Sequence, residues 1–293
     1  MGMLDGKVAI VTGAGGGVGR AHALALSREG AAVVVNDVGG SLDGSSSGSR
    51  VAEQVVAEIK AAGGKAVANF GSVTSAEDAQ AMVAQAVSEF GKLDILINNA
   101  GILRDKSFKN MTEDLWDPVI AVHLKGAFLP TRAAYMQMVE QGKGGRIVMT
   151  SSTSGLIGNF GQTNYGAAKA GIAGFMRCLA IEAAKAKITV NVLAPNAYSR
   201  MTSNLFPPGS EQTLAPERVS PAIVWLCSDE AADITGRQFV ISGNRVTLLY
   251  PAALPIADRS PAEGPWSPSE IGARIRDSVA SWPEPVSVAK LLF

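Results

Sequence analysis

Short, continuous apolar runs alternate along the chain with longer segments in which apolar residues recur every three or four positions. Such runs predict strands buried on both faces, and they lie at residues 7–12, 31–37, 65–70, 93–97, 146–150, 188–195 and 238–242. The segments between them predict helices at residues 20–29, 50–62, from Ser75 onward, at 114–138 as two helices around Gly126, after Tyr165 and at 216–228. This alternation predicts an α/β fold of the Rossmann type, with a doubly wound parallel sheet and right-handed crossovers, in a single domain of residues 1–242.

A C-terminal extension, residues 243–293, follows the last predicted strand. It contains several prolines, Trp266, Trp282 and a helix-like stretch at residues 269–279. Because it carries many apolar residues, the extension predicts an arm that packs on the domain or on a neighbour rather than a disordered tail. Residues 203–216 are polar and proline-rich, and they predict a mobile lid over a substrate.

The charge balance argues against several classes of partner. Lys plus Arg number 26 and Asp plus Glu number 26, so the formal net charge is zero, and nothing indicates a nucleic acid or a membrane surface as partner. No apolar run approaches the roughly 20 residues of a membrane span. Cys178 and Cys227 lie in helix-like apolar segments and predict core thiols of a reducing compartment. With no recognisable signal peptide or peroxisomal address, the sequence predicts a cytoplasmic protein.

A glycine-rich turn joins the first predicted strand to the first predicted helix. Its glycines permit a tight turn and a close approach of the backbone, and the helix N-terminus offers amide donors to a pyrophosphate. The glycine pattern is weak evidence alone, but here a strand precedes it and a helix follows it. The turn therefore predicts a dinucleotide site that includes Gly13, Gly15, Gly17, Val18 and Gly19.

Asp37 ends the second predicted strand, about 20 residues beyond the glycines. A carboxylate at this position can accept both hydroxyls of an adenosine ribose and would repel a 2′-phosphate, and no arginine follows directly to receive one. The alternative is that Asp37 merely starts a turn. Given the glycine turn upstream, the sequence favours NAD as cofactor over NADP.

Tyr165 and Lys169 are four residues apart, so on a helix they lie on one face. A phenol titrates near ~10, and an ammonium close to it favours the phenolate, which can then exchange a proton with a substrate oxygen. Ser152 follows a predicted buried strand, at the edge where ligands of parallel sheets bind, and can hydrogen-bond the same oxygen. A Tyr-x-x-x-Lys pair alone is common, so the prediction of catalysis depends on the serine and on the dinucleotide turn.

Together, Ser152, the Tyr165–Lys169 pair and the TGxxxGxG turn resemble the short-chain dehydrogenase/reductase family. The resemblance implies that Lys169 also binds the nicotinamide ribose, and that Asn99, Ala100 and Gly101 brace the central strand and line the cofactor. His123 stands where the family usually has an asparagine; it either supports a water-relayed proton path or is only a buried histidine. The resemblance also places the following residues beside the cofactor: Ser72 and Val73 at the adenine, and Ala197, Tyr198, Ser199, Arg200 and Thr202 at the nicotinamide.

Five longer segments are more specific than the general family, and they lie at residues 36–40, 100–108, 122–126, 158–165 and 194–202. They are similar to one subgroup of that family, the (3R)-hydroxyacyl-CoA dehydrogenase domain of the type 2 peroxisomal multifunctional enzymes, also described as type 4 17β-hydroxysteroid dehydrogenases. The likeness runs from about Leu4 to about Ser242. It implies an NAD-dependent oxidoreductase that acts on a (3R)-hydroxyacyl-CoA, or on a steroid-like alcohol, in a homodimer or homotetramer. Two alternatives stay open: a dehydrogenase of other lipophilic alcohols, and an NAD-binding regulator whose catalytic residues are vestigial. No metal ligand set is expected.

Overall fold

The computed structural model describes residues 2–40, 50–199, 202, 206–207 and 209–292. Its centre is one eight-stranded sheet with the order β3-β2-β1-β4-β5-β6-β7-β8, in which every pairing is parallel except that of β8 with β7. The strands are β1 (Val8–Thr12), β2 (Ala32–Asn36), β3 (Ala66–Asn69), β4 (Ile95–Asn98), β5 (Gly145–Thr150), β6 (Ile188–Asn196), β7 (Gln238–Ser242) and β8 (Arg245–Leu249). The predicted doubly wound α/β fold is confirmed.

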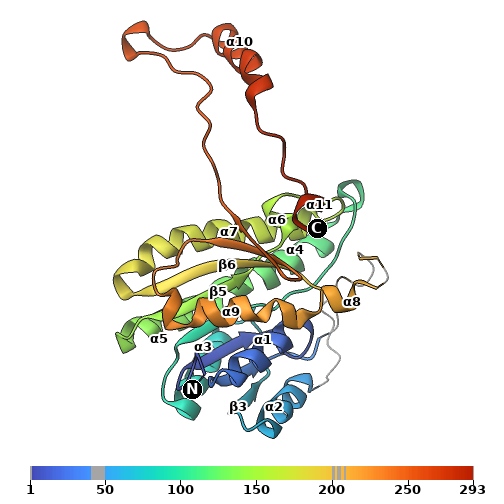
Figure 1. The fold of residues 1–293 in the computed structure, drawn as a ribbon, viewed down its shortest axis with the longest axis vertical. Coiled ribbons are helices and arrows are strands. Elements are labelled where there is room, and N and C mark those ends of the chain that lie inside the picture. Colours follow the sequence, from blue (N-terminus) through green and yellow to red (C-terminus); the bar gives the residue numbers. More distant parts are fainter. Residues whose placement is uncertain (1, 41–49, 200–201, 203–205, 208, 293) are drawn as a thin grey trace.

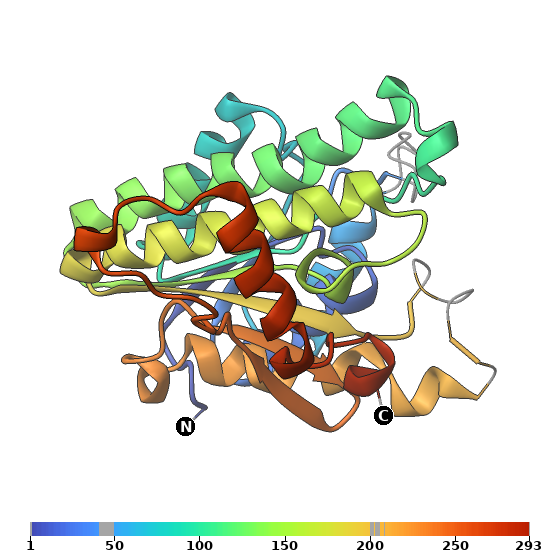
Figure 2. The ribbon, with the colours of Figure 1, turned by 90° about the horizontal axis from the view of Figure 1, so that it is seen from above.

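Helices cover both faces of the sheet (Figures 1 and 2). One face carries α1 (Gly17–Arg28), α2 (Val51–Ala61) and α9 (Ser220–Cys227). The other carries α3 (Ala76–Phe90), α5 (Gly126–Gln141) and α7 (Thr163–Ala183). Shorter helices are α4 (Glu113–Ile120), α6 (Thr153–Leu156), α8 (Ser210–Thr213), α10 (Pro268–Ser278) and α11 (Ala289–Leu292), with 3-10 turns at Phe108–Asn110, Ala184–Ala186, Pro216–Arg218, Asp229–Ala231, Pro261–Glu263 and Val279–Ser281.

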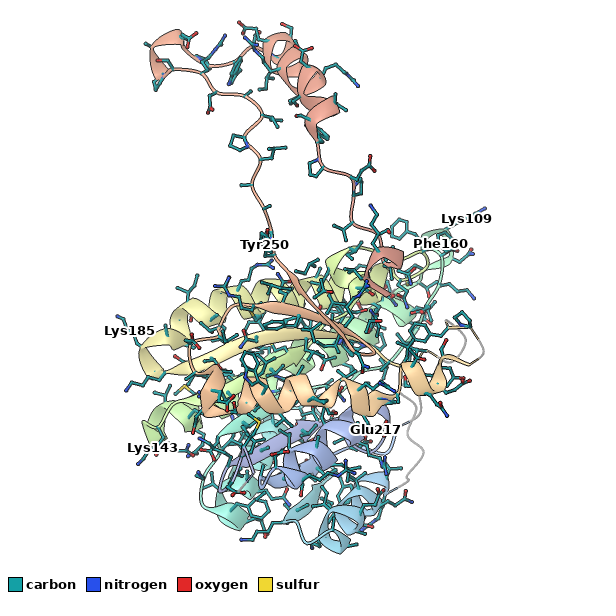
Figure 3. The ribbon with its side chains drawn as sticks, in the orientation of Figure 1. Lys109, Lys143, Phe160, Lys185, Glu217 and Tyr250 are labelled. Atoms are coloured by element: carbon teal, nitrogen blue, oxygen red, sulfur yellow. The ribbon has the colours of Figure 1, made fainter. Side chains whose placement is uncertain are left out.

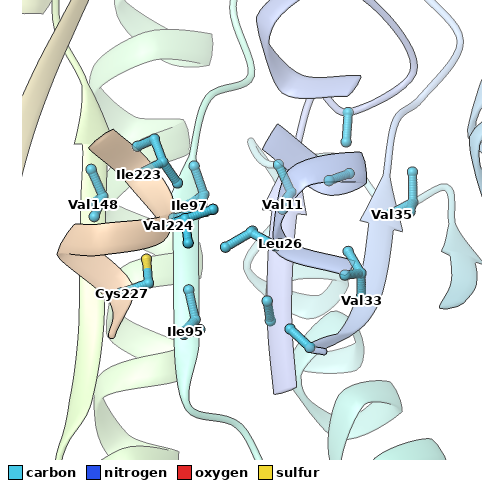
Figure 4. Close-up of a cluster of buried hydrophobic side chains, with 14 of the residues drawn as sticks. Val11, Leu26, Val33, Val35, Ile95, Ile97, Val148, Ile223, Val224 and Cys227 are labelled. Atoms are coloured by element: carbon cyan, nitrogen blue, oxygen red, sulfur yellow. The ribbon is translucent and has the colours of Figure 1, made fainter. Parts of the chain in front are cut away.

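The hydrophobic core lies in two layers because alternate strand residues point to opposite faces of the sheet. In β1, Val11 packs toward α1 and α9, whereas Ile10 packs toward the layer under α3, α5 and α7. Figure 4 shows the first layer, in which Leu26 of α1 and Ile223 of α9 approach the strands. The inner strands β1, β2 and β4 are buried on both faces, as their continuous apolar runs predicted, but in the edge strand β3 only Ala66 is buried, because no further strand covers its outer side.

The segment predicted as two helices around Gly126 is one nearly continuous helical run. A π-helical turn, Ala121–Lys125, joins α4 directly to α5, and His123 lies within it. A second expectation was half wrong: Cys227 is buried in the core, but Cys178 is exposed on α7. An amphipathic helix this long turns one side to solvent, and the local apolar content around Cys178 did not reveal which side.

The C-terminal extension leaves the domain and returns to it. β8 adds an antiparallel strand beyond Ser242, so the sheet continues to Leu249. The chain then runs outward from Tyr250 to α10 and back to α11, as a projecting arm (Figures 1 and 3). The return is anchored because Leu291 packs against Ala194 and Val240. No described helix has the length and apolar content needed to cross a membrane.

Candidate active site

Polar residues end several neighbouring strands at the carboxyl edge of the sheet. Thr12 ends β1, Asn36 ends β2, Asn98 ends β4 and Thr150 ends β5, and all four are buried. The strand order reverses between β1 and β4, and ligands of open α/β sheets bind in the crevice outside such a switch point. The topology therefore brings the glycine turn and the Ser152–Lys169 segment to one edge.

The glycine turn passes very close to the loop after β4. Gly13 has a φ of 62°, and a Cβ there would lie 2.7 Å from the Ala100 Cα. The Asn99 side chain donates to the carbonyls of Thr12 and Gly13, at 3.1 Å each. The Thr12 hydroxyl in turn accepts from the backbone amides of Asn99 (2.9 Å) and Ala100 (3.1 Å). The bracing expected of Asn99 is present in the structure, and Thr12, which sequence reasoning did not single out, completes it.

The N-terminus of α1 suits an anionic ligand. Gly16 is the N-cap and makes no side-chain capping bond, and the first turn holds no acidic residue. The orphan amides of this turn are therefore left for another acceptor, and the macrodipole favours a phosphate there. Gly19 lies against the Gly13 carbonyl and the Asn99 side chain, where a Cβ would collide. The Val18 side chain is partly buried against the core.

Asp37 lies directly beside this turn. One carboxylate oxygen accepts the Gly15 amide and the other accepts the Gly39 amide, each at 2.8 Å. A Cβ on Gly15 would crowd Asp37 and Val51, so this position requires glycine. The carboxylate is thus fixed at the end of β2, next to the turn that suits a pyrophosphate.

Two further segments were expected at the cofactor. Ser72 and Val73 follow β3; the Ser72 amide donates to Asp78 at 2.8 Å, and Val73 is buried against Gly126. The turn after β6 is held by the Thr202 hydroxyl, which accepts from the Ser199 amide at 2.9 Å and donates to the Ala197 carbonyl at 2.5 Å. This turn approaches the glycine turn, since a Cβ on Gly17 would lie 3.6 Å from the Ser199 Cβ. The Tyr198 amide donates to the Leu214 carbonyl, and Arg200 lies outside the described residues, as does part of the expected lid.

Ser152 and Tyr165 lie on two consecutive helices, α6 and α7. Ser152 is the N-cap of α6, and its hydroxyl accepts from the Ser154 amide at 3.2 Å. Burial raises the pKa of the Tyr165 phenol to about 12, while the Ser152 hydroxyl lowers it. The sequence argument predicted a lowered pKa from Lys169, but in this structure desolvation has the larger effect because it disfavours the phenolate.

Lys169 is almost completely buried, with 2% of its surface exposed. Its Nζ donates to the Thr150 carbonyl at 2.7 Å and lies 5.5 Å from the centre of the Tyr165 ring. Burial lowers the pKa of this ammonium from 10.5 to about 7, so the lysine titrates near neutral pH. Gly155 allows α6 to lie this close to Lys169 of α7, because a Cβ on residue 155 would be only 2.5 Å from the Lys169 Cβ.

His123 also contacts Tyr165. The two rings meet edge to face with their centres 5.0 Å apart. The His123 Nε2 lies 3.1 Å from the Ile102 amide and 2.8 Å from the Ile102 carbonyl, so its tautomer decides which of the two it bonds. Burial, and the nearby Lys169 charge, lower the pKa of His123 well below its ordinary value, so the ring is neutral at physiological pH.

A cavity of about 10 Å³ lies between Lys169 and His123, and Asn98 and Thr150 also line it. Three buried polar atoms at its walls have no hydrogen-bond partner among the described residues: His123 Nδ1, Asn98 Oδ1 and Thr150 Oγ1. A cavity of this size with several polar partners is at the threshold for holding one water molecule.

Two residues of the segment before Tyr165 were missed by sequence reasoning. Asn164 is fully buried and donates to the carbonyls of Arg104 and Leu115, at 2.9 Å each. Gln162 is 5% exposed and bonds to three side chains. The sequence shows two amide residues just before the candidate tyrosine, but only the structure shows that both are buried and hydrogen-bonded.

A broad surface depression of about 1280 Å³ lies at the other edge of the sheet, where Gly30, Ala32 and Lys65 are among its lining residues. It is open to solvent, and the Arg20–Glu58 ion pair forms part of its wall. It contains none of the polar residues that end the strands, so the chemistry belongs at the carboxyl edge. Among the described residues, no group of three or more His, Cys, Asp or Glu side chains is placed to hold a metal ion.

Comparison with known proteins agrees with this geometry. A family model described as short chain dehydrogenase matches residues 7–207. The chain belongs to the short-chain dehydrogenase family. It is therefore an oxidoreductase of CH–OH groups that uses a nicotinamide cofactor and a small-molecule substrate.

Individual relatives narrow the comparison. This dehydrogenase is 51% identical to the peroxisomal multifunctional enzyme type 2 of Mus musculus over 79% of its own length, but it spans only 31% of that enzyme. It is 42% identical to the hydroxyacyl-CoA dehydrogenase ChsB1 of Mycobacterium tuberculosis, over 94% of this chain and 90% of that one.

Two solved structures are similar. A short chain dehydrogenase from Mycobacterium avium has a TM-score of 0.85 and 46% identity, and the match covers 98% of this chain and 99% of the other, so it includes the arm. A 7α-hydroxysteroid dehydrogenase complexed with NADH and 7-oxoglycochenodeoxycholic acid has a TM-score of 0.73 and 30% identity, over 82% of this chain and 94% of the other.

Proposed function

We propose that this dehydrogenase transfers a hydride between NAD and the 3-hydroxyl carbon of a (3R)-hydroxyacyl-CoA. The observation that carries the proposal is the grouping of Ser152, Tyr165 and Lys169 at the carboxyl edge, beside a helix N-terminus suited to a pyrophosphate. The acyl-CoA substrate is supported by the relatives named hydroxyacyl-CoA dehydrogenase and multifunctional enzyme type 2.

Each residue has a distinct part in the proposed reaction. The Ser152 hydroxyl holds the substrate oxygen, and the Tyr165 phenol takes or returns its proton. When bound, NAD accepts the hydride, and the positive charge of its ring favours the phenolate. Lys169 lies close enough to add to this effect while it is charged, and its pKa of about 7 makes it a proton donor or acceptor at neutral pH.

His123 has a supporting role beside Tyr165 and Lys169. Its neutral ring presents Nδ1 to the small cavity beside Lys169, and a water held there by Asn98 and Thr150 would connect the two side chains. We assign His123 as a positioning residue with a link to proton exchange, because its Nε2 is committed to Ile102 and its ring contacts Tyr165 edge to face.

The preference for NAD over NADP is also part of the proposal. Asp37 is held by two backbone amides next to the glycine turn, where the adenosine ribose would lie. A fixed carboxylate there accepts ribose hydroxyls and repels a 2′-phosphate. Gly15, Val18 and the turn held by Ser199 and Thr202 would complete the cofactor site.

We further propose that the enzyme is a homodimer or homotetramer. α10 has no buried residue within one chain, and Ile275, Val279 and Trp282 of the arm are each about two-fifths exposed (39%, 44% and 47%). An arm that leaves the domain, returns to it and keeps such apolar side chains partly exposed is typical of a contact with a second copy. Light scattering tests this, and a mass of one chain, 30.3 kDa, would contradict it.

The test of the activity is NADH formation with (3R)- and (3S)-hydroxybutyryl-CoA, each with NAD and with NADP. We expect activity on the 3R series with NAD, and a loss of at least about 100-fold in Tyr165→Phe. The matched control is Tyr135→Phe, a partly buried tyrosine of α5 outside the site. Silence on every acyl-CoA, with activity on a steroid alcohol, would favour the alternative that the 7α-hydroxysteroid dehydrogenase likeness supports.

A further inference from the structure

Gln162 is the centre of a small polar network beside Ser152 of the proposed catalytic site. Its side-chain Nε2 donates to the Asp105 carboxylate at 2.6 Å. Its Oε1 accepts from the Ser154 hydroxyl at 2.6 Å and from the Asn159 amide at 3.1 Å. The Ser154 backbone amide in turn donates to the Ser152 hydroxyl at 3.2 Å. A continuous chain of hydrogen bonds therefore runs from Asp105 to the serine proposed to hold the substrate oxygen.

Backbone contacts fix the same neighbourhood. The Lys106 amide donates to the Gly161 carbonyl at 2.8 Å, so residues 105–106 run alongside the start of α7. Asn164, next to Tyr165, donates to the Arg104 carbonyl at 2.9 Å. Asp105 is thus attached to the first turn of α7 from both sides, and that turn carries Tyr165.

Asp105 is exposed to solvent, and its charge acts on the proposed catalytic tyrosine. Partial desolvation raises the pKa of Asp105, and the Gln162 hydrogen bond opposes that rise. The Asp105 charge raises the pKa of Tyr165. The other charged or titratable groups that face Tyr165 are Lys169 and the neutral His123, and no described residue but Gln162 donates a side-chain hydrogen bond to Asp105.

We infer that Asp105, held in place by Gln162, is a specificity-determining group that excludes substrates with a negative charge near the reacting carbon. In a 3-hydroxyacyl thioester the carbonyl two carbons away is neutral, whereas in the free 3-hydroxy acid it is a carboxylate. A second carboxylate close to Asp105 is disfavoured by like-charge repulsion. The inference deepens the proposed function and depends on it for the choice of thioester.

The experiment compares one neutral and one anionic substrate of the same skeleton. The probes are the N-acetylcysteamine thioester of (3R)-hydroxybutyrate and free (3R)-hydroxybutyrate, with NAD in excess. In Asp105→Asn the ratio of kcat/KM for the thioester to that for the free acid should fall about tenfold, the size expected for one unit charge across a partly solvated site. Asp117→Asn, which removes an equal charge from an exposed position on α4, is the control and should leave the ratio unchanged.

The pH profile separates an electrostatic role from a structural one. Asp105→Asn should move the midpoint of the rise in kcat/KM to lower pH, because an anion nearby raises the pKa of a tyrosine and of a lysine alike. The direction is therefore the same whether the profile reports the titration of Tyr165 or that of Lys169. Gln162→Leu frees the Asp105 carboxylate and should move the midpoint in the same direction by less. In the double variant the midpoint should be that of Asp105→Asn alone, because the charge whose position Gln162 fixes is then absent.

A selectivity ratio and a midpoint that stay at the parent values in Asp105→Asn, with the fold intact by circular dichroism, would overturn the inference. Should the parent enzyme reject both hydroxybutyryl probes, the same comparison is made on a neutral and a carboxylated form of whichever secondary alcohol it oxidises. Failure of the acyl substrate and failure of the charge selectivity are then observed separately.

Discussion

Replacing the buried Lys169 by methionine should abolish activity and, at the same time, change how stability depends on pH. Lys169 is 2% exposed, and its pKa falls from 10.5 in the unfolded chain to about 7 in the folded one. Between these two values the unfolded chain binds one more proton than the folded chain, so the free energy of unfolding rises with pH by at most about 1.4 kcal/mol per pH unit. Over the whole interval of about 3.5 pH units the burial of the ammonium costs up to about 5 kcal/mol.

The direction of the effect follows from the lowered pKa. Above pH 10.5 the lysine is neutral in both the folded and the unfolded chain, so its burial costs no charge desolvation. As pH falls from 10.5 to about 7 the free energy of unfolding decreases, and below about pH 7 the full cost of burying the ammonium is present. The methionine variant has no such proton. Between pH 7 and pH 9 the parent protein should therefore gain about 3 kcal/mol relative to Lys169→Met, or roughly 5–10 °C in Tm.

The assay is thermal or urea unfolding of both proteins at pH 6, 7, 8 and 9. Loss of the Lys169 bond to the Thr150 carbonyl lowers the stability of the variant by a similar amount at every pH, so it shifts the curve without tilting it. The pKa of Tyr165 and that of Cys227 are about 12, outside this range. Lys143→Met, at an exposed position that Figure 3 labels, is the control. Parallel curves for the parent and Lys169→Met would refute the argument that burial controls this ammonium.

Two other substitutions test the cofactor site. Asp37→Ser should lower kcat/KM for NAD by about 10- to 100-fold, the value of a charged hydrogen bond, and so reduce the ratio of kcat/KM for NAD to that for NADP. Steady-state kinetics with both cofactors measures this ratio, and an unchanged ratio would show that Asp37 does not determine the choice of cofactor. Gly19→Ala places a Cβ against the Gly13 carbonyl and the Asn99 side chain, so it should lower Tm by several degrees and weaken NADH binding. The control is Gly272→Ala in α10, which has open space around it and should leave stability unchanged or slightly increased. Equal Tm values for these two glycine variants would contradict the close packing of the turn.

The doubly wound parallel sheet and the edge that carries the candidate site could be predicted from sequence because both depend on local signals; the order of the eight strands came from the structure. Apolar runs identify buried strands, and the right-handed crossover then leaves few arrangements open. The same reasoning placed Ser152 and Asp37 at carboxyl ends of strands, where the structure has them. A Tyr-x-x-x-Lys spacing on a helix also determines that both side chains share a face, whatever surrounds them.

Other features are decided by contacts between distant segments. The pKa values of Tyr165 and Lys169 depend on how completely the folded protein excludes water, and in this structure desolvation outweighs the attraction that the spacing alone suggested. The exposure of Cys178 depends on which side of α7 meets the sheet.

The hydrogen bond between Gln162 and Asp105 joins residues that are 57 positions apart in the sequence, and no local sequence pattern spans that separation. The sequence by itself therefore determined the architecture and the candidate reacting groups, because periodicity and strand ends are local properties. Only the tertiary structure decided their protonation and their partners, because burial and charge act through space between segments that the chain keeps apart.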